Sequence, residues 1–313
     1  MTAAASQALD LQGHRGARGL APENTLPAFA RALSIGVTTL ELDCAITKDG
    51  VVVVSHDSTL SPDITRGPGG KWLGKAGPAI RSLTYQELQR YDVGRLDPAS
   101  AYAKRWPEQQ PADGTRIPRL ADVFALVKKS GNEAVRFNIE TKISPLEPNQ
   151  TAGPEEFARK LVAEIRAGKM EKRATIQSFD WRTLAVVQKE APEVATVYLT
   201  SVSGFMDNIQ AAGESPWTAG HRARDHGGSV PRLVKAAGGA VWSPYSGDLT
   251  QEAVREAQTL GLKVVVWTLN DSARMRRMIE MGVDGVISDR PDLLRKVAGD
   301  MGIPLPPPTP VKP

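Results

Sequence analysis

Eight short segments rich in β-branched residues recur along the chain, and most of them are followed by a stretch with helical periodicity. Strands that alternate with helices favour a parallel sheet covered by helices, and eight parallel strands close into a barrel. We therefore predict an α/β fold, a (β/α)8 barrel of the TIM type. The expected strands are Leu9–His14, Thr38–Cys44, Val135–Lys142, Thr175–Phe179, Ala195–Thr200, Gly239–Pro244, Lys263–Leu269 and Gly285–Ser288.

The helical stretches carry polar caps at several starts and glycines at several ends, as at Gly36 and Gly261. A doubly wound open sheet is the alternative fold, but it would favour a glycine-rich phosphate loop after the first strand, and the sequence has none with that pattern. The expected helices are Leu26–Ile35, Leu120–Lys129, Pro154–Ala167, Arg182–Glu190, Gln251–Leu260, Ala273–Met281 and Pro291–Ala298.

One long segment rich in glycine and proline interrupts the alternation between His56 and Arg119, with a clear helical pattern only at Tyr85–Tyr91. Structureless segments of this length inside a compact domain are usually functional. We predict a barrel domain over residues 9–299, with an inserted cap at 58–118 after the second strand. A Lys48-Asp49-Gly50 turn predicts a hairpin just before the cap. The proline-rich tail, 300–313, is expected to be extended, disordered or draped over the surface.

Composition narrows the function classes. The hydrophobic fraction of 41% and charged fraction of 24% are those of a globular protein, and no apolar run is long enough to span a membrane. The net charge of +4 without a dense basic run argues against a nucleic-acid partner. With a single cysteine, Cys44, no intrachain disulfide can form, so both the cytoplasm and the periplasm remain possible compartments. We expect a cytoplasmic protein, or a periplasmic or secreted one if a signal peptide was removed. The oligomeric state is not predicted.

Carboxylates gather where two expected strands end. Glu41 and Asp43 are two residues apart on one strand, so they share a face, and Leu40 and Leu42 then face the helices. Glu140 ends the next strand and would converge on the same place. An isolated Glu-x-Asp pair is as often a solvated surface pair. Three converging carboxylates instead predict a site for one hard divalent cation, Mg²⁺ or Ca²⁺ first and Mn²⁺ as a third choice.

Basic and histidine side chains are expected at the same barrel mouth. His14 ends the first strand and His56 ends the hairpin strand, and histidine is suited to proton transfer near neutral pH. Arg15 offers a planar fork for a phosphate. Lys142 predicts either an anion contact or a salt bridge to one of the carboxylates. His221 and His226, in a glycine-rich loop, are given no role.

Two further side chains at strand ends are candidates for binding substrate. Gln177 is suited to hydrogen bonding with a substrate hydroxyl, and Trp267 to forming an apolar wall beside a small polyol. For Trp267, core packing is the alternative.

These motifs together resemble the glycerophosphodiester phosphodiesterase family. The resemblance rests on His14-Arg15-Gly16-Ala17, Pro22-Glu23-Asn24-Thr25, Glu41-x-Asp43, Ser55-His56-Asp57, Asn138-Ile139-Glu140-Thr141-Lys142, Gln177-Ser178-Phe179, Val266-Trp267-Thr268-Leu269-Asn270 and the segment Gly282 to Asp289. The motifs stand in the family's order and extend over about residues 11 to 298.

The resemblance implies an enzyme that cuts glycerophosphodiesters into glycerol 3-phosphate and an alcohol. It implies His14 and His56 as the acid–base pair, Glu41, Asp43 and Glu140 as metal ligands, and Arg15 and Lys142 as phosphate contacts. The nucleophile is left open between water and the substrate's own 2-hydroxyl, and so is the preferred head group. The alternatives are a phospholipase D-like enzyme on a similar barrel and a non-catalytic glycerophosphodiester-binding protein.

Overall fold

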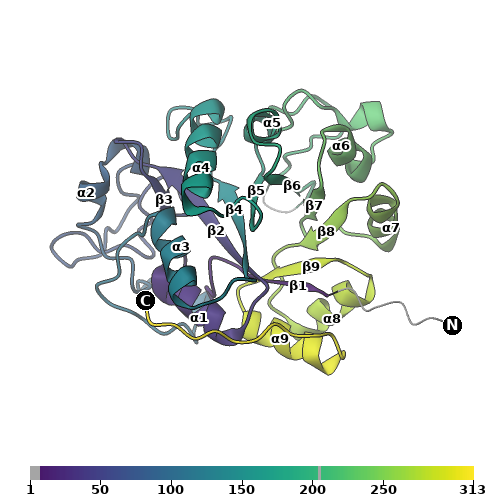
Figure 1. Ribbon diagram of the computed structural model, residues 1–313. Helices are drawn as coiled ribbons and strands as arrows, with labels where there is room; N and C mark the ends of the chain where they lie inside the picture. The colour runs from purple at the N-terminus through teal and green to yellow at the C-terminus, as the bar shows by residue number, and fades with distance from the viewer. Residues whose placement is uncertain (1–7, 204–205) are drawn as a thin grey trace.

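Eight parallel strands close into a barrel in the computed structural model, which describes residues 8–203 and 206–313 (Figure 1). Neighbouring strands follow the order β1-β9-β8-β7-β6-β5-β4-β2, and β1 pairs with β2 to close the ring. The predicted fold is therefore confirmed. The barrel strands are β1 (Asp10–Gly13), β2 (Thr39–Ile46), β4 (Arg136–Thr141), β5 (Ala174–Ser178), β6 (Ala195–Thr200), β7 (Val241–Pro244), β8 (Lys263–Val266) and β9 (Gly285–Ser288).

Helices surround the barrel on the outside (Figure 1). Side chains of Thr25, Asp180, Thr250 and Asp271 accept hydrogen bonds from backbone N–H groups of the first turn, which is why four helices begin where they do. The helices are α1 (Leu26–Ile35), α3 (Leu120–Lys129), α4 (Pro154–Gly168), α5 (Trp181–Glu190), α6 (Val230–Ala236), α7 (Gln251–Thr259), α8 (Ser272–Glu280) and α9 (Pro291–Asp300).

Sequence reasoning missed α6, a short helix that follows the 3-10 turn η3 (Ala223–His226). Its apolar pattern is brief, and the glycines at 227 and 228 immediately before it indicate a loop. The core lies between strands and helices, where Leu40 and Leu42 are fully buried against the helical layer. The alternate residues of β2 therefore face the barrel interior.

The predicted hairpin is present. Strand β3 (Val52–Val54) pairs antiparallel with the end of β2, with Cys44 opposite Val54, and Gly50 takes the positive φ of 81° that the turn requires. The strand ends before His56, which we expected inside it. The backbone N–H of Ser55 still donates to the carbonyl of Asp43 at 2.9 Å, so His56 is held beside the end of β2.

The segment between His56 and Arg119 has little regular structure: η1 (Ile80–Ser82), α2 (Tyr85–Leu88) and η2 (Ala103–Arg105). It has a small apolar cluster of its own, which packs against the hairpin. This cluster consists of Ala45, Val53, Leu60, Ile80, Leu88, Val93 and Ile117.

The proline-rich end crosses the outside of the barrel next to α1 and α3 (Figure 1). The backbone N–H of Thr309 donates to the carbonyl of Leu33 at 2.9 Å, and its hydroxyl accepts from Asn132 at 3.0 Å. The tail is extended, as its composition indicates. In the described part of the chain, no helix is long and apolar enough to cross a membrane.

Candidate active site

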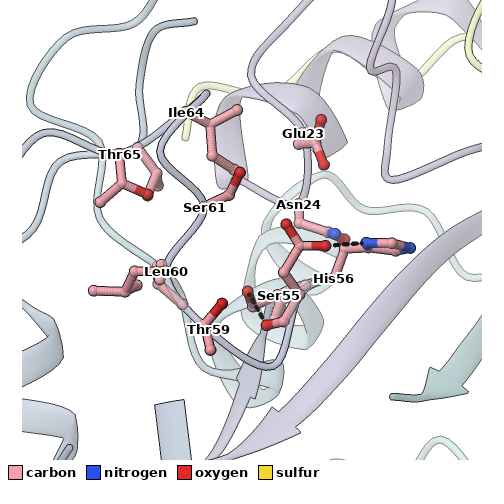
Figure 2. Close-up of a pocket in the computed structure, with 13 residues that line it drawn as sticks. Glu23, Asn24, Ser55, His56, Thr59, Leu60, Ser61, Ile64 and Thr65 are labelled. Carbon is pink, nitrogen blue, oxygen red and sulfur yellow. Dashed lines mark hydrogen bonds and ion pairs between the residues drawn. The ribbon is translucent and has the colours of Figure 1, made fainter. Parts of the chain in front are cut away.

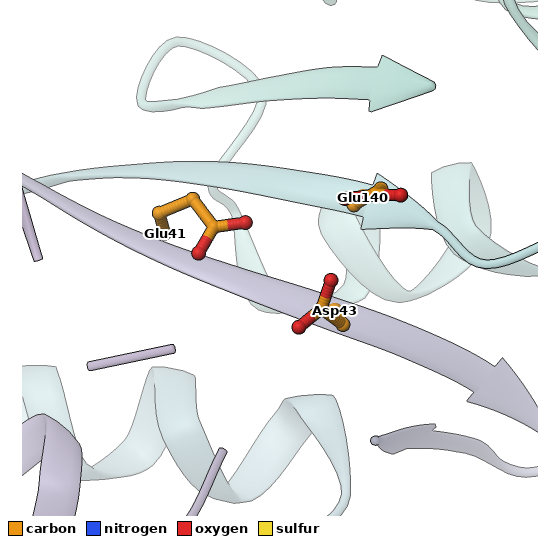
Figure 3. A group of neighbouring side chains, drawn as sticks. All are labelled: Glu41, Asp43 and Glu140. Atoms are coloured by element: carbon orange, nitrogen blue, oxygen red, sulfur yellow. The ribbon is translucent and has the colours of Figure 1, made fainter. Parts of the chain in front are cut away.

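Three carboxylates meet at the carboxyl ends of β2 and β4, the end of such a barrel where active sites lie. Glu41 and Asp43 extend from β2, and Glu140 lies directly opposite Asp43 in the strand register. One oxygen of each lies within 4.8 Å of the other two (Figure 3). All three residues are buried. The sequence prediction that they converge is met.

The close approach of these groups changes their protonation. Burial, and then the charge of Asp43, raise the pKa of Glu41 well above its usual value. Burial also raises the pKa of Glu140, although Lys142 opposes the shift from 2.7 Å. Asp43 keeps a pKa below its usual range, because the positive charges near it outweigh the effect of burial. Three buried carboxylates thus repel one another unless protons or a cation are present.

The donor set fits a hard cation. Oδ1 of Asp43 is buried, and no donor from residues 8–203 or 206–313 hydrogen-bonds to it; Nζ of Lys142 is 3.9 Å away. Both oxygens of Glu41 are held in place, one by the backbone N–H of Arg15 and one by Gln177, each at 2.8 Å. Oxygen ligands held in this way suit Mg²⁺, Ca²⁺ or Mn²⁺.

His14 lies beside this cluster, and its ring is held through Nδ1. Nδ1 is 2.6 Å from Oδ1 of Asp289, and Nε2 is 3.8 Å from Oε2 of Glu41. Asp289 follows β9 and is itself bound by Arg18, at 2.6 and 2.9 Å, and by Asn270 at 2.7 Å. Burial lowers the pKa of His14, although the charge of Asp289 opposes this. The Nε2 atom is therefore the one presented to the cavity.

His56 makes the same type of pair with the residue that follows it. Nδ1 lies 2.6 Å from Oδ1 of Asp57. Burial and the nearby charges of Arg15 and Lys142 lower the pKa of His56 to about 4. The two histidines, which the sequence predicted at one rim, thus each have Nδ1 paired with an aspartate.

Arg15 is held by two acidic residues of the site, Glu23 and Asp43. It has a positive φ of 50°, its Nη1 donates to Glu23 at 2.5 Å, and its Nε is 3.4 Å from Oδ2 of Asp43. Asn24 donates to the same Asp43 oxygen at 2.8 Å. Glu23 and Asn24 come from the loop between β1 and α1, where no periodicity indicates a direction. Their motif was recognised, but their contacts could not be inferred.

Gln177 and Trp267 both line the cavity described below. The amide of Gln177 is 1% exposed and bridges two protein groups: Nε2 donates to Glu41, and Oε1 accepts from Asn138 at 2.8 Å. Trp267 follows β8, donates from its indole to the carbonyl of Ser243 at 2.9 Å and packs edge-on against Phe179. Lys142 forms the salt bridge to Glu140 that we considered as an alternative.

A cavity of about 770 Å³ opens above the carboxylates. Its lining includes the basic and histidine side chains of His14, His56, Arg15, Arg18 and Lys142. It also includes the large apolar side chains of Ile143, Phe179, Leu199, Met206, Trp217 and Trp267. A much smaller hollow of about 20 Å³ lies behind His56, between Asn24 and the start of the glycine- and proline-rich segment (Figure 2). His221 and His226 line neither space.

Known proteins share this sequence and architecture. Residues 14–293 match the model of the glycerophosphoryl diester phosphodiesterase family. A glycerophosphodiester phosphodiesterase of Caldanaerobacter subterraneus is 30% identical over 282 residues, which cover 90% of this chain and 94% of the relative.

Solved structures agree. A structure from Silicibacter pomeroyi, assigned to the glycerophosphoryl diester phosphodiesterases, is 36% identical with a TM-score of 0.85 and covers 96% of each chain. A phosphodiesterase of Oleispira antarctica, solved with its product sn-glycerol-3-phosphate, has the same fold at 21% identity, with a TM-score of 0.65 over 92% of this chain and 96% of the other. The chain belongs to the glycerophosphoryl diester phosphodiesterase family, whose members are phosphoric diester hydrolases.

Proposed function

We propose that this protein is a metal-dependent enzyme that hydrolyses glycerophosphodiesters to glycerol 3-phosphate and an alcohol. The observation that carries the proposal is the arrangement of two histidine–aspartate pairs around three buried carboxylates at the floor of one cavity. Family membership gives the reaction class. The product bound by the Oleispira antarctica phosphodiesterase is consistent with glycerol 3-phosphate as the product here.

Each charged group has a distinct task in this proposal. A divalent cation held by Glu41, Asp43 and Glu140 would neutralise charge on the phosphoryl oxygens. Arg15 and Lys142 both line the cavity and supply further positive charge to the phosphate. Lys142 would exchange part of its salt bridge to Glu140 for the substrate anion.

The two histidines are suited to move protons through Nε2. In each ring, Nδ1 is engaged by an aspartate, which fixes the tautomer and stabilises the imidazolium when it forms. One histidine takes the proton of the nucleophile, and the other gives a proton to the leaving alcohol. Water and the substrate's 2-hydroxyl remain the two candidate nucleophiles, and trapping of a cyclic glycerol phosphate would identify the second.

The test is release of glycerol 3-phosphate from glycerophosphocholine and other head groups, before and after treatment with EDTA. We expect full loss on chelation and recovery with one of Mg²⁺, Ca²⁺ or Mn²⁺. Full activity in metal-free protein would refute the metal requirement. Exchange of Glu41, Asp43 or Glu140 for Ala should weaken cation binding, while the fold is kept. The same exchange at the exposed Glu190 is the matched control.

A phospholipase D-like activity is the second candidate, because part of the cavity lining is apolar. Phe179, Trp217 and Trp267 would accept an acyl chain, and the volume exceeds the needs of a small head group. A lysophospholipid would then be cut at the same phosphodiester. Comparison of kcat/KM for lysophosphatidylcholine and glycerophosphocholine separates the two. A non-catalytic binder would lack one of the five site residues, and all five are in place.

A further inference from the structure

The hydroxyl of Tyr102, in the segment between His56 and Arg119, lies between two charged residues of the β1–α1 loop. It donates a hydrogen bond to Oε2 of Glu23 and accepts one from Nη1 of Arg18 at 3.1 Å. These partners are 79 and 84 residues away in the sequence. A neutral hydroxyl that donates to a carboxylate and accepts from a guanidinium joins the two charges directly.

Each partner leads to a different part of the candidate site. The other oxygen of Glu23 accepts from Arg15, whose Nε is 3.4 Å from Asp43. Arg18 binds both oxygens of Asp289, at 2.6 and 2.9 Å, and Asp289 holds Nδ1 of His14. One hydroxyl thus connects the phosphate-contact arginine with the pair that orients a histidine.

The hydroxyl is separable from the contacts that hold this segment on the barrel. The ring of Trp106 packs on the guanidinium of Arg18, with 4.6 Å between the guanidinium carbon and the ring centre. Gln109 donates to the carbonyl of Arg18 at 2.7 Å, and Glu108 pairs with Arg290 at 2.6 Å. These three contacts remain when the tyrosine hydroxyl is removed.

We propose that Tyr102 is a positioning residue for phosphodiester cleavage, whose hydroxyl fixes Arg15 and Arg18 relative to each other. Arg15 and Arg18 carry like charges in a buried setting, where Glu23 and Asp43 compensate Arg15 and Asp289 compensates Arg18. Loss of the hydroxyl leaves one Glu23 oxygen without a donor and one Arg18 nitrogen without an acceptor. Both arginines then relax toward new partners, which displaces the phosphate contact and loosens the His14 pair. This inference rests on the proposed function.

The experiment is Tyr102→Phe in the full chain, with Tyr91→Phe as the matched control. Tyr91 lies in the same segment, packs against its apolar cluster, and donates no side-chain hydrogen bond within the described residues. We expect Tyr102→Phe to lower kcat/KM about tenfold, the scale of a lost hydrogen bond to a charged group. The factor should be the same for every head group, since the affected residues act on the phosphate. Tyr91→Phe should leave kcat/KM unchanged.

Two further measurements separate positioning from simple docking. The inhibition constant of glycerol 3-phosphate should rise in Tyr102→Phe, because Arg15 is displaced. Trp106→Leu weakens the packing of this segment on the barrel but keeps the Tyr102 hydroxyl. It should therefore lower the Tm, and it should reduce kcat/KM by a smaller factor than Tyr102→Phe does. A Tyr102→Phe protein with unchanged kcat/KM and product affinity, or one whose losses depend on head group, would overturn the inference.

Failure of the proposed function would be visible separately. If the wild-type protein releases no glycerol 3-phosphate from any substrate, the function is wrong. Calorimetric affinity for inorganic phosphate then decides the role of Tyr102 without turnover. A weaker affinity in Tyr102→Phe than in Tyr91→Phe supports positioning of Arg15, and equal affinities refute it.

Discussion

The side-chain amide of Gln177 donates from Nε2 to Oε1 of Glu41 at 2.8 Å. Its own oxygen accepts from Nδ2 of Asn138, which also donates to Gln12 at 2.9 Å, and Gln12 donates to Asp10 at 2.9 Å. A carboxylate oxygen accepts at each end of this series, so each amide between them has one orientation that satisfies its neighbours. The chain of amides extends through the barrel interior and presents a donor to the candidate metal ligand.

This relationship predicts that Gln177 acts on the metal ligand rather than on the substrate. Gln177→Leu removes a donor from Glu41, and we expect cation affinity to fall about 10–100-fold, the usual effect of losing a group that orients a ligand. Titration calorimetry with Mn²⁺ measures it. Gln258→Leu, which removes a glutamine from the outer surface, is the control. A raised KM with unchanged cation affinity would instead support a substrate contact.

The buried carboxylates predict a pH-dependent effect of metal on stability. Burial raises the pKa of Glu140 from 4.5 to about 7. A raised carboxyl pKa contributes stability that is present below 4.5 and is lost as pH rises through about 7. A bound cation replaces the proton and removes that loss. The increase in Tm on adding Mg²⁺ should therefore be small at about pH 5 and larger at about pH 8.

Glu140→Gln is the control for this prediction, because glutamine carries no proton to lose at that position. His56 titrates in the same range with the opposite sign, since its pKa is lowered to about 4 and its contribution is lost as pH falls from 6.5. Comparing how the Tm of the two metal-free proteins depends on pH isolates the effect of the Glu140 proton. Equal metal-induced shifts at both pH values in the wild type would contradict the prediction.

The two histidines predict a matched pair of kinetic defects. His14→Ala and His56→Ala should each lower kcat by about 10²–10⁴, the range for positioned proton transfer. The double variant should lose little more kcat than the more impaired single variant, because the effects of groups that act together are not additive. His226→Ala, outside the cavity, should have no effect on kcat.

A nitrophenyl phosphodiester identifies the acid, because its leaving group needs no proton. This substrate should restore activity to one histidine variant and leave the other impaired. Restoration of both variants, or of neither, would show that the histidines do not divide the work in this way.

The segment we predicted as a cap, 58–118, is expected to govern head-group choice, because Ser58, Thr59 and Ala76 line the cavity. Ala76→Trp should reduce kcat/KM for bulky head groups more than for small ones. The same exchange at Ala99, which lies in this segment but does not line the cavity, is the control. An identical ranking of head groups in both variants would refute the proposed role.

Periodicity predicted the parts of this protein that depend on repeated local patterns. The spacing of Glu41 and Asp43 placed them on a common face, and the parallel register then brought Glu140 opposite Asp43. All eight barrel strands were predicted from short segments rich in β-branched residues. The short helix α6 did not, because its seven residues give too little periodicity between glycines.

Loop contacts could not be predicted, since they depend on how distant segments meet. Nothing in the sequence pairs Arg18 with Asp289 or Tyr102 with Glu23. Gln177 illustrates a different difficulty. Its position at a strand end was predicted, but its contacts with Glu41 and Asn138 depend on how side chains of neighbouring strands meet inside the barrel. The sequence pattern predicts which face of a strand a side chain occupies, and the contacts in the structure indicate what that side chain does.

The pair between His14 and Asp289 has a consequence for biosynthesis. These residues are 275 positions apart, one at the end of the first barrel strand and the other just past the last. A nascent chain that has emerged from the ribosome only through β8 contains both histidines and all three carboxylates, yet lacks the group that orients the His14 ring. In the proposed function, hydrolysis therefore requires the last barrel strand, so activity would report closure of the barrel.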